Sequence, residues 1–496
     1  MTSEGGPVSR RGRVALVGGV AAVAFALRLH MELHGGGLLG INAYDDGVHL
    51  SSAAAMVHGR VPYRDFLFLQ PPGMLLAASP FALLARLLGD PVALAAFRVA
   101  FELVGAASAA MVVVVLRPFG FAAALAGGLC YAVFAPAVYD ERTALLEPAG
   151  TLAVLGALAL LPRATRTGRG AALGVGALLG VAIDFKGWYV VAALVILLAA
   201  RGARLRVLIG LVVAVGVVML PFFALAPQQF VAQVALAQLG RPRFVGATPV
   251  VRLASMLGVT GIHSRTPIPG VPPALALAVA LAGTLAATVL AAIDRRSRVF
   301  VALGAADLVV ALLAPSWFPH YASLTAPLLA LVVGVAVGAL AGRLRSRAAR
   351  PILVGVVVVG LVGANAAHDL VRVDVRPPGA ALRAAAARIP GCIVADDPTI
   401  LLVMDVLTRD LDRGCPLRPD VSGYSYGPDA VRVAGVPLAR TGNARYQAGV
   451  VRYLRSGDAV IRVRSATRLN AASVAEVDRG PVLFRSGRYV IRSTAP

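Results

Sequence analysis

Two adjacent acidic residues, Asp45 and Asp46, lie in a stretch that is rich in side chains able to move a proton. Neighbouring carboxylates repel each other, which disfavours ionising both at once. If the stretch is helical, Asp45 and His49 lie four residues apart on one face, and a carboxylate there can take a proton from a hydroxyl group. Asp45 is therefore a candidate general base. The alternative is an aspartate that only caps a helix.

Two short motifs follow the acidic pair. They are Gly59-Arg60-Val61-Pro62-Tyr63-Arg64-Asp65-Phe66 and Gln70-Pro71-Pro72-Gly73. An Asp-Asp pair alone is a weak signal, because many solvated turns contain one. The pair together with both motifs is a much more specific pattern.

Lys186 is the only lysine among the 47 lysine and arginine residues. A strong preference for arginine is what a GC-rich genome produces, so a single retained lysine indicates a need for a compact ammonium group. Charged groups at membrane depth are costly and usually functional. We expect Lys186 to bind a lipid phosphate. The alternatives are an ion pair with Asp184 and a side chain that snorkels to the interface.

His320, Arg241 and Arg243 are further candidates for binding the phosphate of a donor. Arginine can hold a phosphate through two parallel hydrogen bonds, and histidine can donate one. The alternatives are lipid-headgroup contacts for the arginines and an interfacial aromatic belt around His320. No Gly-x-x-x-x-Gly-Lys-Ser/Thr loop occurs in the sequence, which argues against ATP hydrolysis, and no Cys/His spacing typical of zinc occurs either.

A membrane domain has to position these residues. Of 496 residues, 58% are hydrophobic and only 15% are charged, and the mean hydropathy is +0.78; a soluble protein carries about a quarter charged residues. Apolar runs long enough to cross a bilayer as helices recur from Val14 to Ala367. The net charge of +22 would suggest nucleic acid in a soluble protein. Here the arginines cluster in short loops between apolar runs, so we expect no nucleic-acid partner.

These arginine clusters determine the expected topology, because short basic loops stay in the cytoplasm. Placing every cluster inside predicts eleven spans in a plasma membrane, with the N-terminus cytoplasmic and the C-terminus outside. Lys186 then lies at the outer tip of a helix pair, and Met74–Leu88 is a re-entrant or interfacial helix. The expected spans are Val14–Met31, Phe97–Leu116, Phe121–Val138, Pro148–Leu161, a pair within Ala171–Ala200, Val207–Leu225, Ala274–Ile293, Val299–Leu313, Ala322–Leu340 and Ile352–Ala367.

The expected fold class is an all-α polytopic membrane protein with a small C-terminal α/β domain. The boundary falls between residues 1–367 and residues 368–496, and residues 34–92 form the first external loop. Short β-like runs alternate with helix-like runs after residue 367, in a segment long enough for its own core. Cys392 and Cys415 would lie in an oxidising compartment, where we expect a disulfide between them. Two unpaired buried thiols are the alternative.

The acidic pair in the first external loop and the two motifs after it resemble the GT-C superfamily of integral-membrane glycosyltransferases. The resemblance covers about residues 10 to 370. It includes the protein mannosyltransferases that use dolichyl-phosphate mannose, the bacterial aminoarabinose transferase of lipid A, and actinobacterial cell-envelope transferases. It implies that Asp45 is the catalytic base and that Asp46 shapes the acceptor site. This chain has Asp-Asp where the protein mannosyltransferases have Asp-Glu.

The resemblance also implies roles outside the acidic pair. It places a second acid at Glu147, a lysine at Lys186 and a His-Tyr pair at His320. For Glu147 the alternative is a carboxylate that only favours the start of a helix. Side chains expected to bind the substrate are His49, Tyr63, Asp65, Gln70 and Glu147.

The implied reaction is transfer of a sugar from a polyprenyl-phosphate carrier to an acceptor hydroxyl on the outer face of the membrane. One base and no enzymic nucleophile imply inversion at the anomeric carbon. The enzyme would be a hexosyl- or pentosyltransferase, and the arginine and alanine bias, typical of an actinobacterium-like source, suggests mannosyl or arabinosyl transfer. The acceptor is a glycan, a lipid or a protein. The scheme requires no metal or other cofactor, although some relatives use a divalent cation.

A secondary transporter or a flippase for a lipid-linked sugar is the alternative. Transporters place ionisable residues near the membrane midplane and show internal repeats. Here the charges gather at one expected external face and no internal repeat is apparent. The sequence therefore favours the enzyme.

Overall fold

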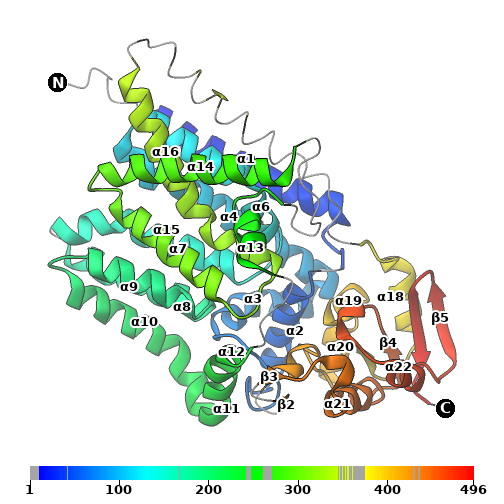
Figure 1. Ribbon diagram of the computed structural model, residues 1–496. Helices are drawn as coiled ribbons and strands as arrows, with labels where there is room; N and C mark the ends of the chain where they lie inside the picture. Colours follow the sequence, from blue (N-terminus) through cyan, green and yellow to red (C-terminus); the bar gives the residue numbers. More distant parts are fainter. Residues whose placement is uncertain are drawn as a thin grey trace. The chain divides into compact units, whose positions relative to one another are not determined.

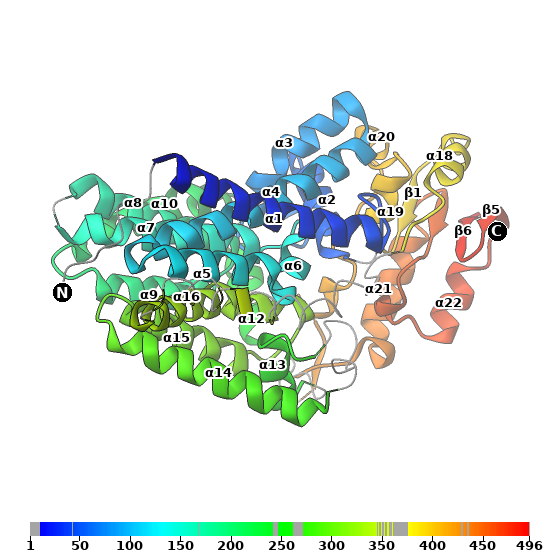
Figure 2. The same ribbon diagram turned by 90° about the horizontal axis from the view of Figure 1, so that it is seen from above.

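The computed structural model describes most of the chain, and its ribbon is shown from two directions in Figures 1 and 2. The described residues are 10–41, 43–166, 168–241, 247–260, 271–344, 346, 349, 352, 355–356, 360, 375–427, 430–433 and 436–495. The expected span Ile352–Ala367 falls almost entirely outside them, as does Arg243.

The chain divides into two compact units. The first contains Met1–Met31, Phe101–Val215 and Phe244–Val371, and the second contains Glu32–Ala100, Gly216–Arg243 and Arg372–Pro496. The sequence analysis grouped residues 34–92 with the membrane domain, whereas in the structure they pack in one unit with the C-terminal residues. An antiparallel bridge between Ile41 and Val375 joins these two segments of the second unit.

Six described helices are long and apolar enough to cross a membrane, or seven if one bent pair counts as a span, so the chain is a multi-pass membrane protein. The bent pair is α5 (Phe121–Val133) and α6 (Ala135–Glu141), whose axes differ by 59°. The six are α1 (Arg10–Gly35), α4 (Asp90–Leu116), α7 (Glu147–Arg166), α10 (Arg204–Leu225), α14 (Pro273–Ile293), and α16 (Ala326–Arg343) with the 3-10 helix η3 (Pro319–Thr325) before it.

The expected pair within Ala171–Ala200 is present as α8 (Arg169–Phe185) and α9 (Tyr189–Ala199), which break at Lys186. Helix α9 has 11 residues and rises about 16 Å, roughly half the thickness of a hydrocarbon core. Its length alone therefore does not make it a full span. Other described helices of the first unit include α5 (Phe121–Val133), α6 (Ala135–Glu141), α13 (Pro249–Met256) and α15 (Arg298–Leu313).

Helices α8 and α10, which run side by side in Figure 1, approach closely because each carries glycine at the contact. A Cβ at Gly176 would lie 1.9 Å from the Val207 carbonyl oxygen, and a Cβ at Gly210 would lie 2.2 Å from that of Leu173. Small residues that let backbones meet are the usual solution for helix packing in lipid, where burial of apolar surface gives little driving force.

The C-terminal part of the second unit contains a four-stranded mixed sheet in the order β1-β4-β6-β5. Strands β1 (Ile393–Ala395) and β4 (Ala459–Ile461) are parallel, whereas β6 (Tyr489–Ser493) is antiparallel to both β4 and β5 (Val482–Ser486). This confirms the small α/β domain. Other elements here are α18 (Gly379–Ala387), α19 (Pro398–Val403), α20 (Leu407–Asp412), β2 (Arg432–Val433), β3 (Val436–Pro437), α21 (Ala444–Leu454) and α22 (Ala471–Val477).

The first-loop part of the second unit contains α2 (Asp45–Val57) and α3 (Gly73–Leu88), which pack against each other. Helix α3 leaves Leu83 and Leu87 exposed on one side, the pattern of an interfacial helix. The second unit also contains the short helical segments α11 (Pro227–Val231), η2 (Ala232–Leu236) and α12 (Ala237–Leu239).

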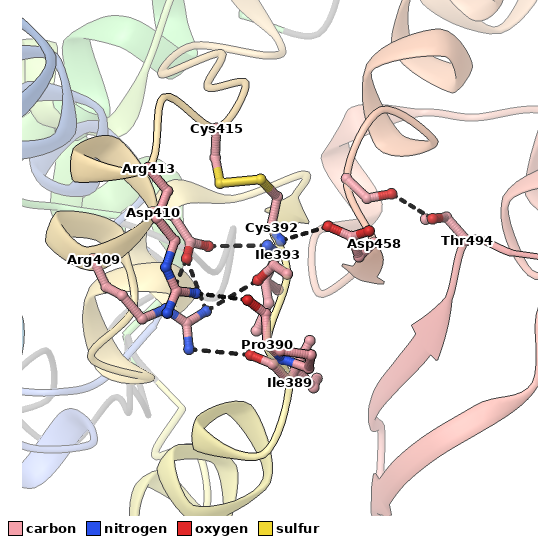
Figure 3. The surroundings of a disulfide bond; sticks show 12 residues. Ile389, Pro390, Cys392, Ile393, Arg409, Asp410, Arg413, Cys415, Asp458 and Thr494 are labelled. Carbon is pink, nitrogen blue, oxygen red and sulfur yellow. Dashed lines mark hydrogen bonds and ion pairs between the residues drawn. A yellow bond between two sulfur atoms is a disulfide. The ribbon is translucent and has the colours of Figure 1, made fainter.

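Cys392 and Cys415 form a disulfide, with their Cα atoms 5.6 Å apart (Figure 3). The bridge joins the start of β1 to the turn that follows α20. Around it, Asp410 accepts a hydrogen bond from the Ile393 amide and Asp458 accepts one from the Cys392 amide. Closing a loop of this size stabilises a fold by roughly 3 kcal/mol in the chain-entropy model.

Candidate functional site

The two groups of candidate residues lie in different units, and each has its own geometry. The first group surrounds the start of α2. Asp45 is the first residue of that helix, so the condition for Asp45 and His49 to lie on one helix face is met. Asp45 is half-buried, whereas Asp46 is fully buried. A carboxylate at a helix start is favoured by the positive end of the helix dipole.

Asp46 is held in a buried ion-pair network. Arg98 Nε donates to Asp46 Oδ2 at 2.7 Å, and Arg98 Nη1 donates to Glu32 Oε1 at 3.0 Å. All three side chains have no exposed surface. The Gly47 amide also donates to Asp46, at 2.7 Å. Asp46 is thus fixed in place by protein groups, and Asp45 is the member of the pair that reaches the surface.

The backbone just before Asp45 makes an unusual turn. Tyr44 has φ 58° and ψ −56°, and the Asp45 amide donates to the Ala43 carbonyl at 2.6 Å. These values describe a γ-turn with a positive central φ, a rare and strained form. Such a conformation costs about 1–3 kcal/mol and persists only where the surroundings hold it. The turn determines the position of the Asp45 backbone, from which the carboxylate side chain extends.

The other loop candidates mostly stabilise the loop itself. The Tyr63 hydroxyl donates to the Gln70 carbonyl at 2.8 Å, and the ring packs edge-on against Phe230. Burial raises the pKa of Tyr63 well above its ordinary value, so the hydroxyl keeps its proton. Asp65 accepts from the Val61 amide at 2.7 Å and pairs with Arg64, and these contacts lower its pKa. His49 is buried, with its ring 6.3 Å from that of Phe68.

The second group surrounds Lys186, in the first unit. Lys186 lies at the break between α8 and α9 in extended backbone, and its ammonium group donates to Glu147 Oε1. The same ammonium lies 3.8 Å from the Trp188 ring centroid and 4.3 Å from that of Tyr321. A cation enclosed by two aromatic faces is stabilised without being neutralised. The sequence analysis offered Asp184 as the structural partner of Lys186, whereas the structure pairs Lys186 with Glu147.

Glu147 connects this lysine to other polar residues. His320 Nε2 lies 3.6 Å from Glu147 Oε1, and the Tyr189 hydroxyl donates to the Glu147 carbonyl at 2.9 Å. Asp140 accepts from the Ser323 hydroxyl at 2.6 Å. Among the described residues, Glu147 Oε2 and Asp140 Oδ1 are buried without a hydrogen-bond partner. Buried acceptors left open in this way can receive hydrogen bonds from a bound ligand.

The arginine candidates have different positions. The Arg241 guanidinium lies 5.6 Å from the Tyr426 ring centroid in the second unit, and Arg243 lies outside the described residues. Sequence reasoning missed Arg252 on α13, a buried residue whose guanidinium donates to the Ala311 and Ala314 carbonyls at 2.9 and 2.6 Å. It thereby caps the C-terminal end of α15, close in sequence to His320.

The first unit also contains a large cavity of about 1910 Å³. Its lining is mostly apolar, with side chains from α1, α4, α5, α7, α8 and α16. Both Ala149 and Arg163 of α7 line it, so the cavity follows that helix for about 21 Å. One end of the cavity is lined by Ala149 and Phe185, which lie close in sequence to Glu147 and Lys186. The other end is lined by Arg117 and Arg163.

Where the structure describes the chain, no group of three His, Cys, Asp or Glu side chains is arranged to hold a metal ion. Trp188 and Asp140 are further residues that sequence reasoning did not assign to the site. The signal that could have identified Trp188 is its position two residues after the single lysine.

No family model matches the sequence, and no curated protein matches it in sequence. The fold, however, is similar over nearly the whole chain to that of ArnT from Cupriavidus metallidurans. The similarity to the apo structure covers 98% of both chains, with a TM-score of 0.61 and 16% identity. For the structure bound to undecaprenyl phosphate it covers 98% of this chain and 99% of the other, with a TM-score of 0.60 and 16% identity. The chain therefore has the same overall fold as ArnT.

Proposed function

We propose that this protein transfers a sugar from a polyprenyl-phosphate carrier to an acceptor hydroxyl on the outer face of the membrane. The observation that carries the proposal is the fold similarity along the whole chain to ArnT, one structure of which binds undecaprenyl phosphate. The site residues support it independently, because they include a half-buried carboxylate and a buried ammonium group. Mannosyl or arabinosyl transfer is the proposed specificity.

Asp45 is the proposed base. Its neighbour Asp46 is committed to Arg98 and has no exposed surface, so it is poorly placed to receive a proton from a substrate. Asp45 lies at the first position of α2 and reaches the surface. The geometry therefore favours Asp45 for proton transfer. Asp46, through its ion pair with Arg98, would instead hold the loop in place.

Lys186 is the proposed ligand of the donor phosphate, with His320 beside it. In the described structure the ammonium is balanced by Glu147 and enclosed by Trp188 and Tyr321. An incoming phosphate would share or replace Glu147 as the counter-ion. Such a competition would tie the position of the lysine to the presence of donor.

The proposed reaction is a single displacement. The acceptor oxygen attacks the anomeric carbon as Asp45 takes the hydroxyl proton. The bond between that carbon and the phosphate oxygen breaks, and the carrier phosphate leaves with the electron pair. Lys186 stabilises the charge that grows on the leaving phosphate, as fixed cations do where charge develops in a transition state. One attack without an enzymic nucleophile gives inversion.

The cavity in the first unit favours a long apolar donor. Its apolar walls follow α7 for about 21 Å, and a polyprenyl chain is a linear hydrocarbon of the kind that such a space accepts. The same cavity favours the second candidate, a flippase for lipid-linked sugar. Arginines line one of its ends, and Phe185, the residue before Lys186, lines the other. A flippase would move the carrier lipid without cleaving its sugar.

The test is a transfer assay on the purified full chain in nanodiscs, with polyprenyl phosphates that carry radiolabelled mannose or arabinose. Crude envelope from the source cell supplies the acceptors, and parallel reactions contain EDTA or added divalent cations. We expect label to move from the lipid to a product of different mobility. Label that crosses the bilayer but stays on the lipid would instead establish the flippase.

A topology test accompanies it. A reporter active only in the cytoplasm, fused after the last residue, should be silent if the C-terminal domain is outside. A strong signal would place that domain in the cytoplasm and remove the outer-face part of the proposal.

A further inference from the structure

We infer that Arg464 and Asp420, in the C-terminal α/β domain, are positioning residues for the proposed reaction: they hold Tyr44 in its strained turn and so set the position of Asp45. The expected change in kcat rests on the proposed function. The structural part of the inference stands on contacts inside the second unit alone.

The ring of Tyr44 is held from one face by an arginine. The Arg464 guanidinium lies 3.4 Å from the ring centroid. Tyr44 is buried, with 4% of its surface exposed. A guanidinium stacked on an aromatic face combines a cation–π attraction with planar contact, so Arg464 restrains the orientation of the ring.

The hydroxyl of Tyr44 is held at its other end. It donates to Asp420 Oδ1 at 2.9 Å and accepts from the Ser422 amide at 3.1 Å. Burial raises the pKa of Tyr44 well above its ordinary value, so the hydroxyl keeps the proton that it donates. Ring and hydroxyl are therefore both fixed by residues far along the chain.

The sheet topology explains why Arg464 can reach the loop. Strands β1 and β4 are parallel neighbours, so their carboxyl ends meet at one edge of the sheet. Asp396 and Asp397 follow β1 and Arg464 follows β4. The Arg464 amide donates to Asp396, and Asp397 caps α19 by accepting from the Thr399 amide at 2.9 Å.

The same edge also packs against α2 one turn beyond Tyr44. A Cβ at Gly47 would lie 2.0 Å from Thr399 Oγ1 and 2.9 Å from the Thr399 Cα, so only glycine allows this approach. The residues on both sides of Asp45 are thus fixed: Tyr44 by Arg464 and Asp420, and Asp46 by Arg98. The proposed base lies between two anchored neighbours.

The test compares Arg464→Met with Arg462→Met in the full chain. Arg462 also follows β4, but its Nε and Nη2 atoms donate to the Asp478 carboxylate at 3.0 and 2.6 Å. It is therefore the matched control. Two readouts are measured: donor kinetics, and hydrogen exchange of the peptide that contains residues 43–49. Exchange needs no substrate, so it distinguishes failure of this inference from failure of the proposed function.

For Arg464→Met we expect kcat to fall about ten- to a hundredfold, with the donor KM changed less than about threefold. Exchange at residues 43–49 should become at least about tenfold faster, while peptides from β1 and β4 keep their protection. Arg464→Lys, which keeps the charge and loses the planar contact, should recover part of kcat. Arg462→Met should match the wild type in both readouts.

Two results would overturn the inference. One is an Arg464→Met protein that matches Arg462→Met in kcat and in loop exchange. The other is loss of protection throughout the C-terminal domain, because Arg464 would then support the domain rather than the loop.

Discussion

The acidic loop and the lysine break both place a charged residue where chemistry is proposed, but they hold it in different ways. At the loop, the carboxylate of Asp45 is positioned through its backbone, by a strained turn and two anchored neighbours. At the break, the ammonium of Lys186 is positioned through its own head group, by Glu147 and two aromatic rings.

The difference teaches how each environment constrains a charge. A half-buried carboxylate keeps part of its contact with water, so its position depends strongly on the backbone that carries it. An ammonium in an apolar region must be compensated, because an uncompensated buried charge is costly. The first arrangement is therefore sensitive to distant packing, and the second to the balance of charges within a few ångströms.

The largest effect should come from breaking the network under the loop. Arg98→Met leaves the buried carboxylates of Asp46 and Glu32 without this partner, and breaking a buried ion pair on one side costs about 3–5 kcal/mol. We expect a lower unfolding midpoint and poor recovery of folded protein. Replacing Asp46 and Glu32 by Asn and Gln in the same chain should restore much of the midpoint. A single variant as stable as the wild type would contradict the buried network.

The next effect concerns the lysine break. If Lys186 holds the donor phosphate, losing one charge-assisted hydrogen bond costs about 1.5–3 kcal/mol. Lys186→Met should then lose about ten- to a hundredfold in donor affinity or rate, and Lys186→Arg should recover only part.

A paired variant separates binding from folding. Lys186→Met alone leaves Glu147 buried without its ammonium, whereas Lys186→Met with Glu147→Gln removes both charges. We expect the double variant to fold like the wild type and still bind donor weakly, as measured by titration of polyprenyl phosphate. Wild-type donor binding by the double variant would assign Lys186 a structural role.

Much of the fold was predictable from the sequence because it depends on local patterns. The apolar runs and arginine clusters predicted the positions of α1, α4, α7, α10, α14 and α16. The short β-like runs after residue 367 predicted β1, β4 and β6. The number of full spans was harder to predict, since an 11-residue helix such as α9 has the composition of a span without its length.

The candidate site was predictable in its residue types and not in its contacts. Asp46 and Arg98 are 52 residues apart, and Tyr44 and Asp420 are 376 apart, and no local periodicity relates such positions. Asp184 was the nearest acid to Lys186 in sequence, but the break in the helix at Lys186 lets the side chain reach Glu147 instead. The positive φ of Tyr44 had no sequence signal, because glycine or asparagine normally occupies such a position.

A separate effect, on stability alone, concerns the pH dependence of the sheet edge. Burial raises the pKa of Asp396 to about 7, against about 3.9 in an unfolded chain. Between these values the folded state holds a proton that the unfolded state has released. The free energy of unfolding should therefore decrease as pH rises from about 4 to 7, by up to about 1.4 kcal/mol per pH unit from this group.

Pulse proteolysis of the full chain in urea can measure this. Wild type and Asp396→Asn are compared at each pH, so that changes in protease activity cancel. We expect the wild type to lose stability relative to the variant as pH rises from 5 to about 7. A difference that stays constant over this range would mean that Asp396 titrates elsewhere.

Turnover of Asp45→Asn and Asp46→Asn, measured with the same labelled donor, tests the central claim most directly. Asp45→Asn keeps the shape of the side chain and removes the proton acceptor. It should fold and insert normally and lose about 10²–10⁴-fold in kcat, the usual contribution of a general base. Asp46→Asn should mainly lower stability. The molecules of this variant that remain folded should keep their activity. Near wild-type turnover by folded Asp45→Asn would contradict the assignment of the base.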